Sequence, residues 1–367
     1  MKKVIYIVKS ELHIYPPCIA QIRMLKKNGV DVEVWYGSCA KQLLAIFDAE
    51  NIPYVDLHEQ RGKLPGKLDR LNNWYQFASA VKKKMKTVKD ASQTLFWFGT
   101  AETAMPMVGK LKGYNYALTS LELLDDNKTK NRLFSMLTGD AKFIVCCETT
   151  RAFIMRNWYG LKKLPYVMPN KPYDFQDARR KTPSIEATKK AIELVQDKKF
   201  IIYQGILKSR DYMLEMARAI RDSGTGYYFV LMGLDPENIF ADIKKEYDKS
   251  IFIKNIPAPY HLEVTSYAAI GFVFYDDRNS LNRAFCAPNK IYEYAGCNIP
   301  MIGTDVLGLK EPFEKYNIGV CCRDLKPETI IDAIRYVDTN HDEMVKNSKT
   351  FFDRVDLDYI VNSIVND

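Results

Sequence analysis

The sequence predicts an α/β protein made of two doubly wound domains. In the N-terminal half, short runs that are apolar throughout alternate with helical patterns. The charged segment Asp174–Lys198 interrupts this alternation, which then starts again. Strands that are apolar on both faces are typical of a parallel sheet covered by helices on both sides. A length of 367 residues accommodates two such domains.

Residues 1–175 are expected to form the first Rossmann-like domain. Its strands are predicted at the apolar runs Val4–Val8, Val32–Tyr36, Tyr54–Leu57, Thr94–Phe98, Tyr116–Thr119, Phe143–Cys147 and Tyr166–Met168. Its helices are predicted at Pro17–Lys27, Asp69–Val88, Thr100–Leu111, Lys128–Leu137 and Thr149–Tyr159. Ligands of such domains bind beyond the carboxyl ends of the strands.

Residues 176–345 are expected to form the second Rossmann-like domain, after a linker and a lead-in helix. Its strands are predicted at Phe200–Tyr203, Tyr228–Met232, Ile251–Ile253, Ile270–Tyr275, Pro300–Ile302 and Gly319–Cys321. Its helices are predicted at Arg210–Arg221, Pro236–Tyr247, Tyr260–Ala268, Asn289–Ala295 and Pro327–Val337. The last segment, 346–367, is expected to be a helix that packs back toward the first domain.

The composition is that of a globular protein without a membrane span. Hydrophobic residues make up 47% and charged residues 27%, and the net charge of +8 suits an anionic ligand or surface. The apolar run after Met1-Lys2-Lys3 is short and is followed by Lys9-Ser10-Glu11, which indicates a first strand, not a signal peptide. The eight cysteines lack C-x-x-C spacing. They indicate core residues of a cytoplasmic protein.

The most informative stretch is Pro288-Asn289-Lys290-x-x-Glu293. It is expected to open a helix, whose free N–H groups and dipole favour an anion at its start. Lys290 adds a positive charge there, and Glu293 lies one turn further on the same face. A sugar nucleotide offers a diphosphate to Lys290 at the helix start and ribose hydroxyls to Glu293. The alternative is an ordinary amphipathic helix with a surface Lys290–Glu293 pair.

The second half resembles, in order, the donor domain of a GT-B glycosyltransferase, most similar to the retaining family 4 and its capsule, exopolysaccharide and O-antigen relatives. The resemblance rests on the Pro288–Glu293 helix and on further segments in the expected places. These are Ile202–Arg210, Phe229–Gly233, Ile251–Pro257, Ala268–Tyr275, Gly303–Lys310, Tyr316–Gly319 and, at the end of the first domain, Pro169-Asn170.

The resemblance implies a donor site in the second domain. Arg210 and Lys290 would hold the diphosphate and stabilise the leaving group, with Lys208 as a substitute for Arg210. The alternatives are that Arg210 is a surface residue at the start of a helix and that Lys208 is simply exposed to solvent. Glu293 would bind the ribose. Gly205 would let the donor approach the backbone, and the loop at Ile256 would contact the base. Asn282, Pro288 and Asn289 complete the predicted donor-binding set.

The sequence departs from the family pattern in three places. The family often has a second glutamate eight positions before the one at Glu293, where this chain has Phe285. Pro16-Pro17 replaces a glycine pair in the first loop. The first-domain histidine has no clear match, so Glu122 is the substitute candidate, as a catalytic residue and an acceptor ligand; the alternative is an ordinary exposed acid of a loop. His13, in the first loop, is the other predicted acceptor-binding residue, with a structural role as its alternative.

A basic run, Lys82, Lys83, Lys84 and Lys86, ends a helix that also carries Trp74, Tyr75, Phe77 and Val81. It is either a contact with an anionic membrane or a solvated helix face. The protein is expected in the cytoplasm. If the lysine run contacts a membrane, the contact is expected at the inner face of the plasma membrane. No nucleic-acid partner is expected.

The resemblance implies transfer of a sugar from a nucleoside diphosphate sugar to a hydroxyl of a bacterial surface glycan, lipid-linked in similar enzymes, with retention of configuration. Neither a cofactor nor a metal is expected. There is no Asp-x-Asp of the kind that holds one, and Asp276-Asp277 is the nearest approach. Two alternatives remain: a nucleotide-sugar epimerase of the same fold, and a catalytically silent partner subunit. The lack of a G-x-G-x-x-G after either first strand argues against a dehydrogenase.

Overall fold

The structure is a computed structural model that describes residues 3–57, 66–173, 175, 179–276 and 278–366. The chain divides into two compact units. The first unit comprises Met1–Tyr173 and Asp356–Asp367, and the second comprises Asp174–Val355. The boundary predicted at residue 176 lies outside the described residues. Of the predicted C-terminal segment, residues 346–355 group with the second unit and only residues 356–367 with the first.

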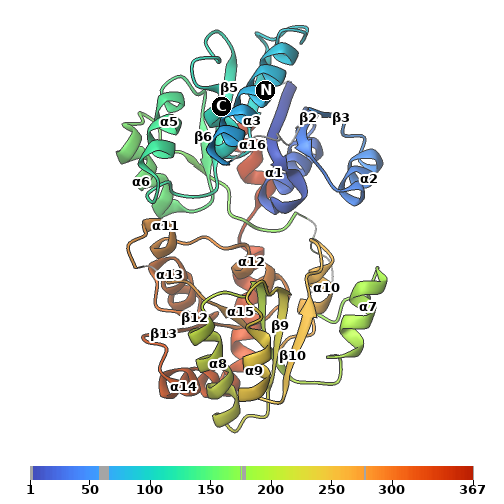
Figure 1. Ribbon diagram of the computed structural model, residues 1–367, viewed down its shortest axis with the longest axis vertical. Helices are drawn as coiled ribbons and strands as arrows, with labels where there is room; N and C mark the ends of the chain where they lie inside the picture. The colour runs from blue at the N-terminus through green and yellow to red at the C-terminus, as the bar shows by residue number, and fades with distance from the viewer. Residues whose placement is uncertain (1–2, 58–65, 174, 176–178, 277, 367) are drawn as a thin grey trace. The chain divides into compact units, whose positions relative to one another are not determined.

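The first unit is built on a seven-stranded sheet in the order β3-β2-β1-β4-β5-β6-β7. Figure 1 labels β2, β3, β5 and β6 of this sheet. Every pair of neighbouring strands is parallel. The strands are β1 (Lys3–Glu11), β2 (Asp31–Ser38), β3 (Tyr54–Asp56), β4 (Thr94–Phe98), β5 (Asn115–Ser120), β6 (Ile144–Cys146) and β7 (Tyr166–Val167). Because all of them run the same way, their carboxyl ends meet at one edge of the sheet.

Helices cover both faces of this sheet. The helical elements are η1 (Leu12–Ile14), α1 (Pro16–Lys27), α2 (Lys41–Ala49), α3 (Gly66–Met85), α4 (Ala101–Ala104), η2 (Met105–Met107), α5 (Lys128–Thr138), α6 (Thr149–Tyr159) and α16 (Leu357–Asn366). One apolar cluster joins α3, α5 and α6 to Ile5 and Ile7 of β1. On the other face, the Tyr6 hydroxyl donates to Gln21 Oε1 of α1 at 2.5 Å.

The second unit is built on a six-stranded sheet in the order β10-β9-β8-β11-β12-β13, again with parallel neighbours. The strands are β8 (Phe200–Ile206), β9 (Tyr228–Leu234), β10 (Ser250–Lys254), β11 (Ile270–Val273), β12 (Met301–Thr304) and β13 (Gly319–Cys322). The chain order reverses between β8 and β11. In a doubly wound sheet, such a reversal opens a crevice at the carboxyl edge.

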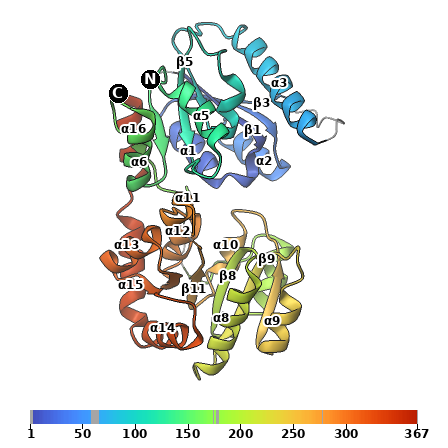
Figure 2. The same cartoon turned by 60° about the vertical axis from the view of Figure 1, so that its left-hand side comes forward.

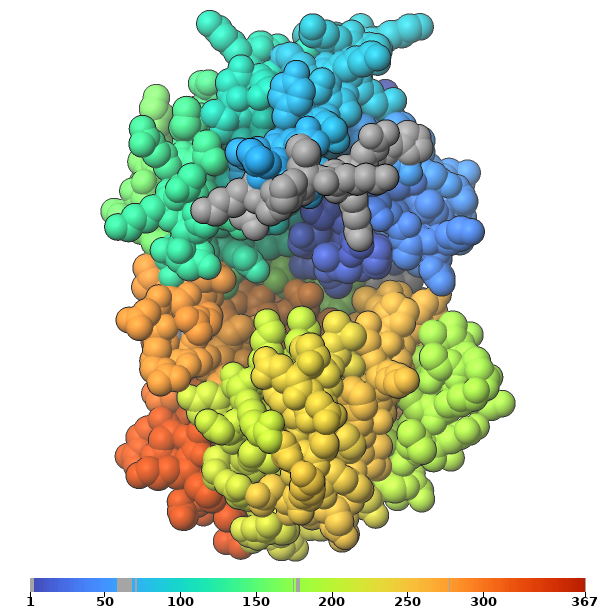
Figure 3. Space-filling view, in the orientation of Figure 1, coloured from blue at the N-terminus to red at the C-terminus, as the bar shows by residue number. Residues whose placement is uncertain are grey.

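Two helical layers enclose this second sheet. On one face, α8 (Arg210–Asp222), α9 (Phe240–Glu246) and α14 (Pro327–Thr339) bury their apolar side chains in one cluster. Figure 1 labels α8 and α9 at the front of the second unit, and Figure 3 shows their atoms in the same orientation. The other layer consists of α7 (Glu186–Glu193), α10 (His261–Thr265), α12 (Asn289–Gly296), α13 (Leu307–Tyr316) and α15 (His341–Asp353). The predicted fold class, α/β with two parallel Rossmann-like sheets, is therefore confirmed.

Several helices differ from their prediction. The helix predicted at Thr100–Leu111 is only α4 followed by the turn η2, which contains Pro106. The prediction missed α2, the short α11 (Leu281–Ala284) and α13, which has Pro312 in its interior. The predicted C-terminal helix is two helices, α15 and α16. The second joins the first unit, where Asp358 Oδ2 accepts from Lys27 Nζ at 2.7 Å.

Two glycines allow β8 and β9 to come together at their carboxyl ends. Gly205 and Gly233 face each other in the paired register, with φ values of +131° and +151°. A Cβ placed on Gly233 would lie only 1.8 Å from the Gly205 carbonyl oxygen. No side chain fits there, and non-glycine residues are also strained at such a φ. This pair of glycines therefore fixes the shape of the sheet edge at which the candidate site lies.

We predict that Gly233→Ala lowers the free energy of unfolding by about 3 kcal/mol or more, because backbone atoms must separate to admit the methyl group. Urea denaturation followed by circular dichroism measures the loss. Gly224→Ala is the matched control, since Gly224 also has a positive φ of +73° but open space around its Cβ position. Its cost should be only about 1 kcal/mol. Equal losses in the two variants would contradict the close-approach argument.

Candidate functional site

The candidate site of the second unit is centred on α12. Pro288 has an extended backbone, with φ −73° and ψ 144°, and precedes the helix as its N-cap residue instead of opening it. Asn289 and Lys290 therefore occupy the first turn, where backbone N–H groups have no partner within the helix. The sequence was right about the position of the helix. An anion is electrostatically favoured at this end.

The Lys290 side chain folds over the carboxyl end of β8. Its Nζ lies 4.7 Å from the centroid of the Tyr203 ring. A Cβ on Gly205 would be 3.4 Å from the same Nζ. Within the described part of the chain, the Lys290 ammonium has no ion pair and no hydrogen bond. A cation whose three N–H donors lack protein acceptors is well suited to an anionic ligand.

Burial lowers the pKa of Lys290 to about 8, and the nearby Glu293 carboxylate offsets part of this effect. The cause is the loss of water around the ammonium, which disfavours the charged form. Lys290 is therefore still mostly protonated at neutral pH, but a bound diphosphate would stabilise its charge further.

Glu293 is held in a chain of buried polar groups. Its side chain is only 8% exposed, and the Gln204 amide nitrogen donates to its Oε2. Thr265 Oγ1 donates to the Gln204 amide oxygen at 2.7 Å. On the other oxygen, His261 Nε2 lies 3.3 Å from Oε1. Because an ionised carboxylate only accepts, the amide nitrogen of Gln204 must be the atom that faces Glu293.

The alternative interpretation of the α12 motif was a surface ion pair between Lys290 and Glu293. The structure shows a different arrangement. Among the described residues, the Glu293 carboxylate contacts His261 and forms no ion pair with Lys290. A carboxylate has about four lone-pair positions, of which two are used here. The remaining positions are what a ligand hydroxyl would need.

The predicted cations in the loop after β8 are placed differently from Lys290. Arg210 is the first residue of α8, is half exposed and forms an ion pair with Asp242 of α9. Lys208 is exposed in the loop. No contact in the described structure joins either of them to Lys290. Arg210 is therefore not brought to the Lys290 ammonium by the fold itself, and a diphosphate role for it requires release from Asp242.

The other predicted donor residues occupy the same unit. Ile256 is buried, at 7% exposure, just after β10. Asn282 is partly buried on α11, and Asn289 is partly buried at the start of α12. The donor-binding role of Ile256, Asn282 and Asn289 therefore stays a prediction.

In the first unit, the predicted acceptor residues follow β1 and β5. Glu122 is exposed two residues after β5, and its carbonyl oxygen accepts from Ser120 Oγ at 2.7 Å. Its charge contributes, after burial and Glu102, to raising the pKa of Tyr15. His13 is partly buried in η1, and its Nδ1 is buried without a hydrogen-bond partner among the described residues. Both therefore lie at the carboxyl edge of the first sheet, but no described contact joins them.

Two of the four lysines in the basic run at the end of α3 take part in the packing of the first unit. Lys82 donates to the Lys110 carbonyl and lies 4.4 Å from the centroid of the Tyr114 ring. Lys84 lies 5.3 Å from the Trp35 ring centroid, while Lys83 and Lys86 are exposed. The aromatic and aliphatic neighbours of the run, Phe77 and Val81, are buried in the core. The exposed apolar residues of α3 are instead in its N-terminal half, which extends beyond its neighbours in Figure 2.

The acidic residues considered for a metal have other partners. Asp276 forms an ion pair with Arg278 at 2.6 Å, which lowers the pKa of Asp276 to about 2. Asp277 lies outside the described residues. An Asp-x-Asp triplet does occur at Asp356-Leu357-Asp358, but Asp358 binds Lys27 and Asn28, and Asp356 Oδ1 accepts from the Tyr359 backbone N–H. Among the described residues, no group of three or more His, Cys, Asp or Glu side chains could hold a metal ion.

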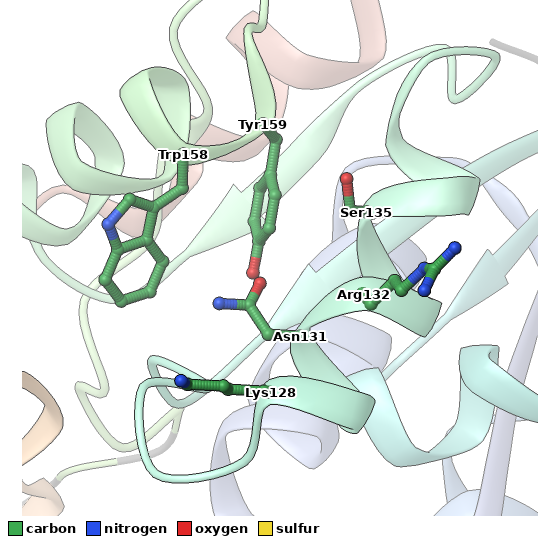
Figure 4. Close-up of a pocket in the computed structure, with 6 residues that line it drawn as sticks. All are labelled: Lys128, Asn131, Arg132, Ser135, Trp158 and Tyr159. Atoms are coloured by element: carbon green, nitrogen blue, oxygen red, sulfur yellow. The ribbon is translucent and has the colours of Figure 1, made fainter.

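A pocket of about 320 Å³ lies between α5 and α6 of the first unit. Figure 4 shows the Tyr159 ring beside Trp158, with its hydroxyl directed toward the Asn131 side chain. Lys128, Arg132 and Ser135 complete the lining. None of the site residues predicted from the sequence lines this pocket.

Sequence reasoning missed three polar members of the Glu293 network, namely Gln204, His261 and Thr265. Gln204 carried a usable signal, because it is a polar residue between the apolar run Phe200–Tyr203 and Gly205. A buried amide in a parallel strand needs a partner. His261 and Thr265 carried no such signal, since only the fold brings α10 beside α12.

Comparison with solved structures identifies the fold. HepE (Alr3699) of Anabaena, solved with UDP, is similar with a TM-score of 0.71 and 12% identity, over 100% of this chain and 99% of that one. Sucrose-phosphate synthase from Thermosynechococcus elongatus is similar with a TM-score of 0.70 and 13% identity, over 100% of this chain and 98% of that one. A putative UDP-N-acetylglucosamine 2-epimerase from Listeria monocytogenes is similar with a TM-score of 0.69 and 14% identity, over 100% of this chain and 95% of that one.

Neither a protein-family model nor a curated protein matches the sequence. Among the described helices, none combines the length and the apolar character that a membrane crossing requires. At 12–14% identity, the solved structures establish the architecture alone. The chain therefore has the two-domain GT-B fold.

Proposed function

We propose that this protein is a glycosyltransferase that binds a nucleoside diphosphate sugar at α12 of its second unit. The observation that carries the proposal is the pairing on one helix of Lys290 and Glu293. The ammonium lies over the Tyr203 ring but has no ion pair and no hydrogen bond among the described residues, and the carboxylate is fixed one turn away. A diphosphate and a ribose are the parts of one ligand that match these two groups.

The comparisons support this ligand class. The HepE structures contain UDP, UDP with glucose, and UDP-glucose. They share this chain's fold over its whole length. The bound nucleotide belongs to HepE, and its transfer to this chain is part of the proposal.

The proposed reaction breaks the bond between the anomeric carbon and the diphosphate oxygen, and the bonding electrons leave with the diphosphate. The acceptor hydroxyl forms the new bond to the anomeric carbon, and its proton passes to the departing diphosphate oxygen. Lys290 and the first-turn amides of α12 stabilise the charge that gathers on the diphosphate. This charge is greater in the transition state than in the bound donor, so the contact accelerates the reaction. Arg210 would add a second cation after leaving Asp242.

The proposal extends to a glycan hydroxyl as acceptor, lipid-linked in the growing surface polysaccharide, and to retention of configuration without a metal. Glu122 and His13 are the proposed acceptor residues of the first unit. The similarity to polysaccharide-assembly enzymes in the sequence motifs supports this extension.

An epimerase is the second candidate. One similar structure is a putative UDP-N-acetylglucosamine 2-epimerase, and this chain places His261 against the Glu293 carboxylate. A silent partner subunit is the third possibility left by the sequence, since Phe285 stands where the family often has a glutamate.

The function is tested by incubating the pure protein with UDP-, GDP- and dTDP-sugars, with soluble and lipid-linked glycans as acceptors. We expect release of one nucleoside diphosphate that rises when an acceptor is added and is unchanged by EDTA. Mass spectrometry and NMR of the product give the linkage and the anomeric configuration. An altered sugar nucleotide without nucleotide release indicates the epimerase. No turnover with any donor, despite nucleotide binding, indicates the silent subunit.

The affinity for the diphosphate should also depend on pH through Lys290. The ammonium is charged below its pKa of about 8 and loses its proton above it. Isothermal titration calorimetry should therefore show the affinity for UDP falling roughly ten-fold between pH 7 and pH 9. In Lys290→Arg, the guanidinium stays charged over this range, so the fall should disappear. An identical pH profile in the wild type and in Lys290→Arg would contradict the role of Lys290.

A further inference from the structure

The contact between His261 and Glu293 has no counterpart in the motifs from which the site was predicted. His261 is the first residue of α10, and its side chain is 14% exposed. Its Nε2 faces Glu293 Oε1 at 3.3 Å, while its Nδ1 is buried with no hydrogen-bond partner among the described residues. The ring is thus held at one nitrogen only.

This one-sided contact determines where the proton of the ring lies. The Glu293 carboxylate can only accept, so the nitrogen that faces it must carry the hydrogen. The geometry therefore places a hydrogen on Nε2, from which it is donated to Glu293 Oε1. This contact uses one lone pair of the carboxylate and leaves others available to a ligand.

The other charged side chain of α10 does not compete for this histidine. Glu263 accepts from the Ser184 backbone N–H at 3.0 Å and from Thr188 Oγ1 at 2.5 Å. On the opposite side of Glu293, Gln204 is itself fixed by Thr265. The Glu293 carboxylate is thus held by two elements, β8 through Gln204 and α10 through His261.

We infer that His261 is a positioning residue of the donor site, which orients the Glu293 carboxylate toward the ribose hydroxyls of the nucleotide. This inference rests on the proposed function. A carboxylate gripped at both oxygens cannot rotate away, so its free lone pairs point in a fixed direction. The preorganised acceptor binds hydroxyl groups without first paying for its own ordering. If the His261 ring is replaced by a group that cannot donate a hydrogen bond, Glu293 Oε1 loses its partner. The Glu293 carboxylate can then rotate.

The decisive experiment compares two ligands in calorimetry, UDP and 2′,3′-dideoxy-UDP, which lacks the ribose hydroxyls. If the donor panel shows GDP to be preferred, GDP and its dideoxy form take their place. In His261→Phe, the affinity for the ribonucleotide should fall about ten-fold, and the affinity for the dideoxy nucleotide should change less than two-fold. In His261→Gln, whose amide can donate to Glu293, most of the discrimination should return.

His341→Phe is the matched control. His341 lies in the same unit, and its Nε2 is 3.0 Å from the Ala269 carbonyl oxygen instead of Glu293. It should leave the discrimination between the two nucleotides unchanged. Thermal melts establish that each variant folds. If His261→Phe does not fold, His261→Gln and His261→Asn carry the comparison, since the shorter Asn should reach Glu293 less well and discriminate less.

A second readout needs no variant protein for its signal. In ¹⁵N-histidine NMR of the wild type, the His261 resonances should show a hydrogen on Nε2, with His261→Gln used for assignment. Equal losses for both nucleotides, no loss, or a ring protonated only at Nδ1 would each overturn the inference while nucleotide binding itself persists. Absence of binding by any nucleoside diphosphate would overturn the proposed function, and the inference with it.

Discussion

The candidate site depends on one electrostatic arrangement, a partly buried ammonium and a buried carboxylate one turn apart on α12 that do not neutralise each other. Lys290 lies over β8 beside Tyr203, whereas Glu293 is engaged by Gln204 and His261. Had the two formed the simple helix pair, neither charge would be available to a ligand. Their separation leaves a cation at the start of the helix and an oriented acceptor deeper in it.

This arrangement is possible because of the backbone beneath it. The close approach at Gly205 and Gly233 removes side chains from the carboxyl ends of β8 and β9, and the Lys290 ammonium occupies part of the space above Gly205. Parallel pairing sets the register that brings Gln204 of β8 next to Glu293. The electrostatics of the site thus follow from the geometry of the sheet edge, and a change in either glycine would alter both.

Much of the fold could be predicted from the sequence, because buried parallel strands are apolar throughout. The strands around β4, β8 and β9 were located within a few residues for this reason. Some helices were not: α13 carries Pro312 in its interior, where a proline usually argues against a helix, and α15 and α16 were predicted as one helix. The site was predicted where chemistry is local in sequence, at Lys290 and Glu293. It was incomplete where the partners come from separate elements, as with His261 and with the Arg210–Asp242 ion pair.

The central claim is that α12 receives a diphosphate at its amino end. The most direct test is a crystal structure of the protein with the nucleoside diphosphate that binds most tightly. The account predicts phosphate oxygens within hydrogen-bond distance of Lys290 Nζ and the first-turn amides of α12, with the ribose against Glu293. A nucleotide bound with its phosphates away from the start of α12 would contradict it.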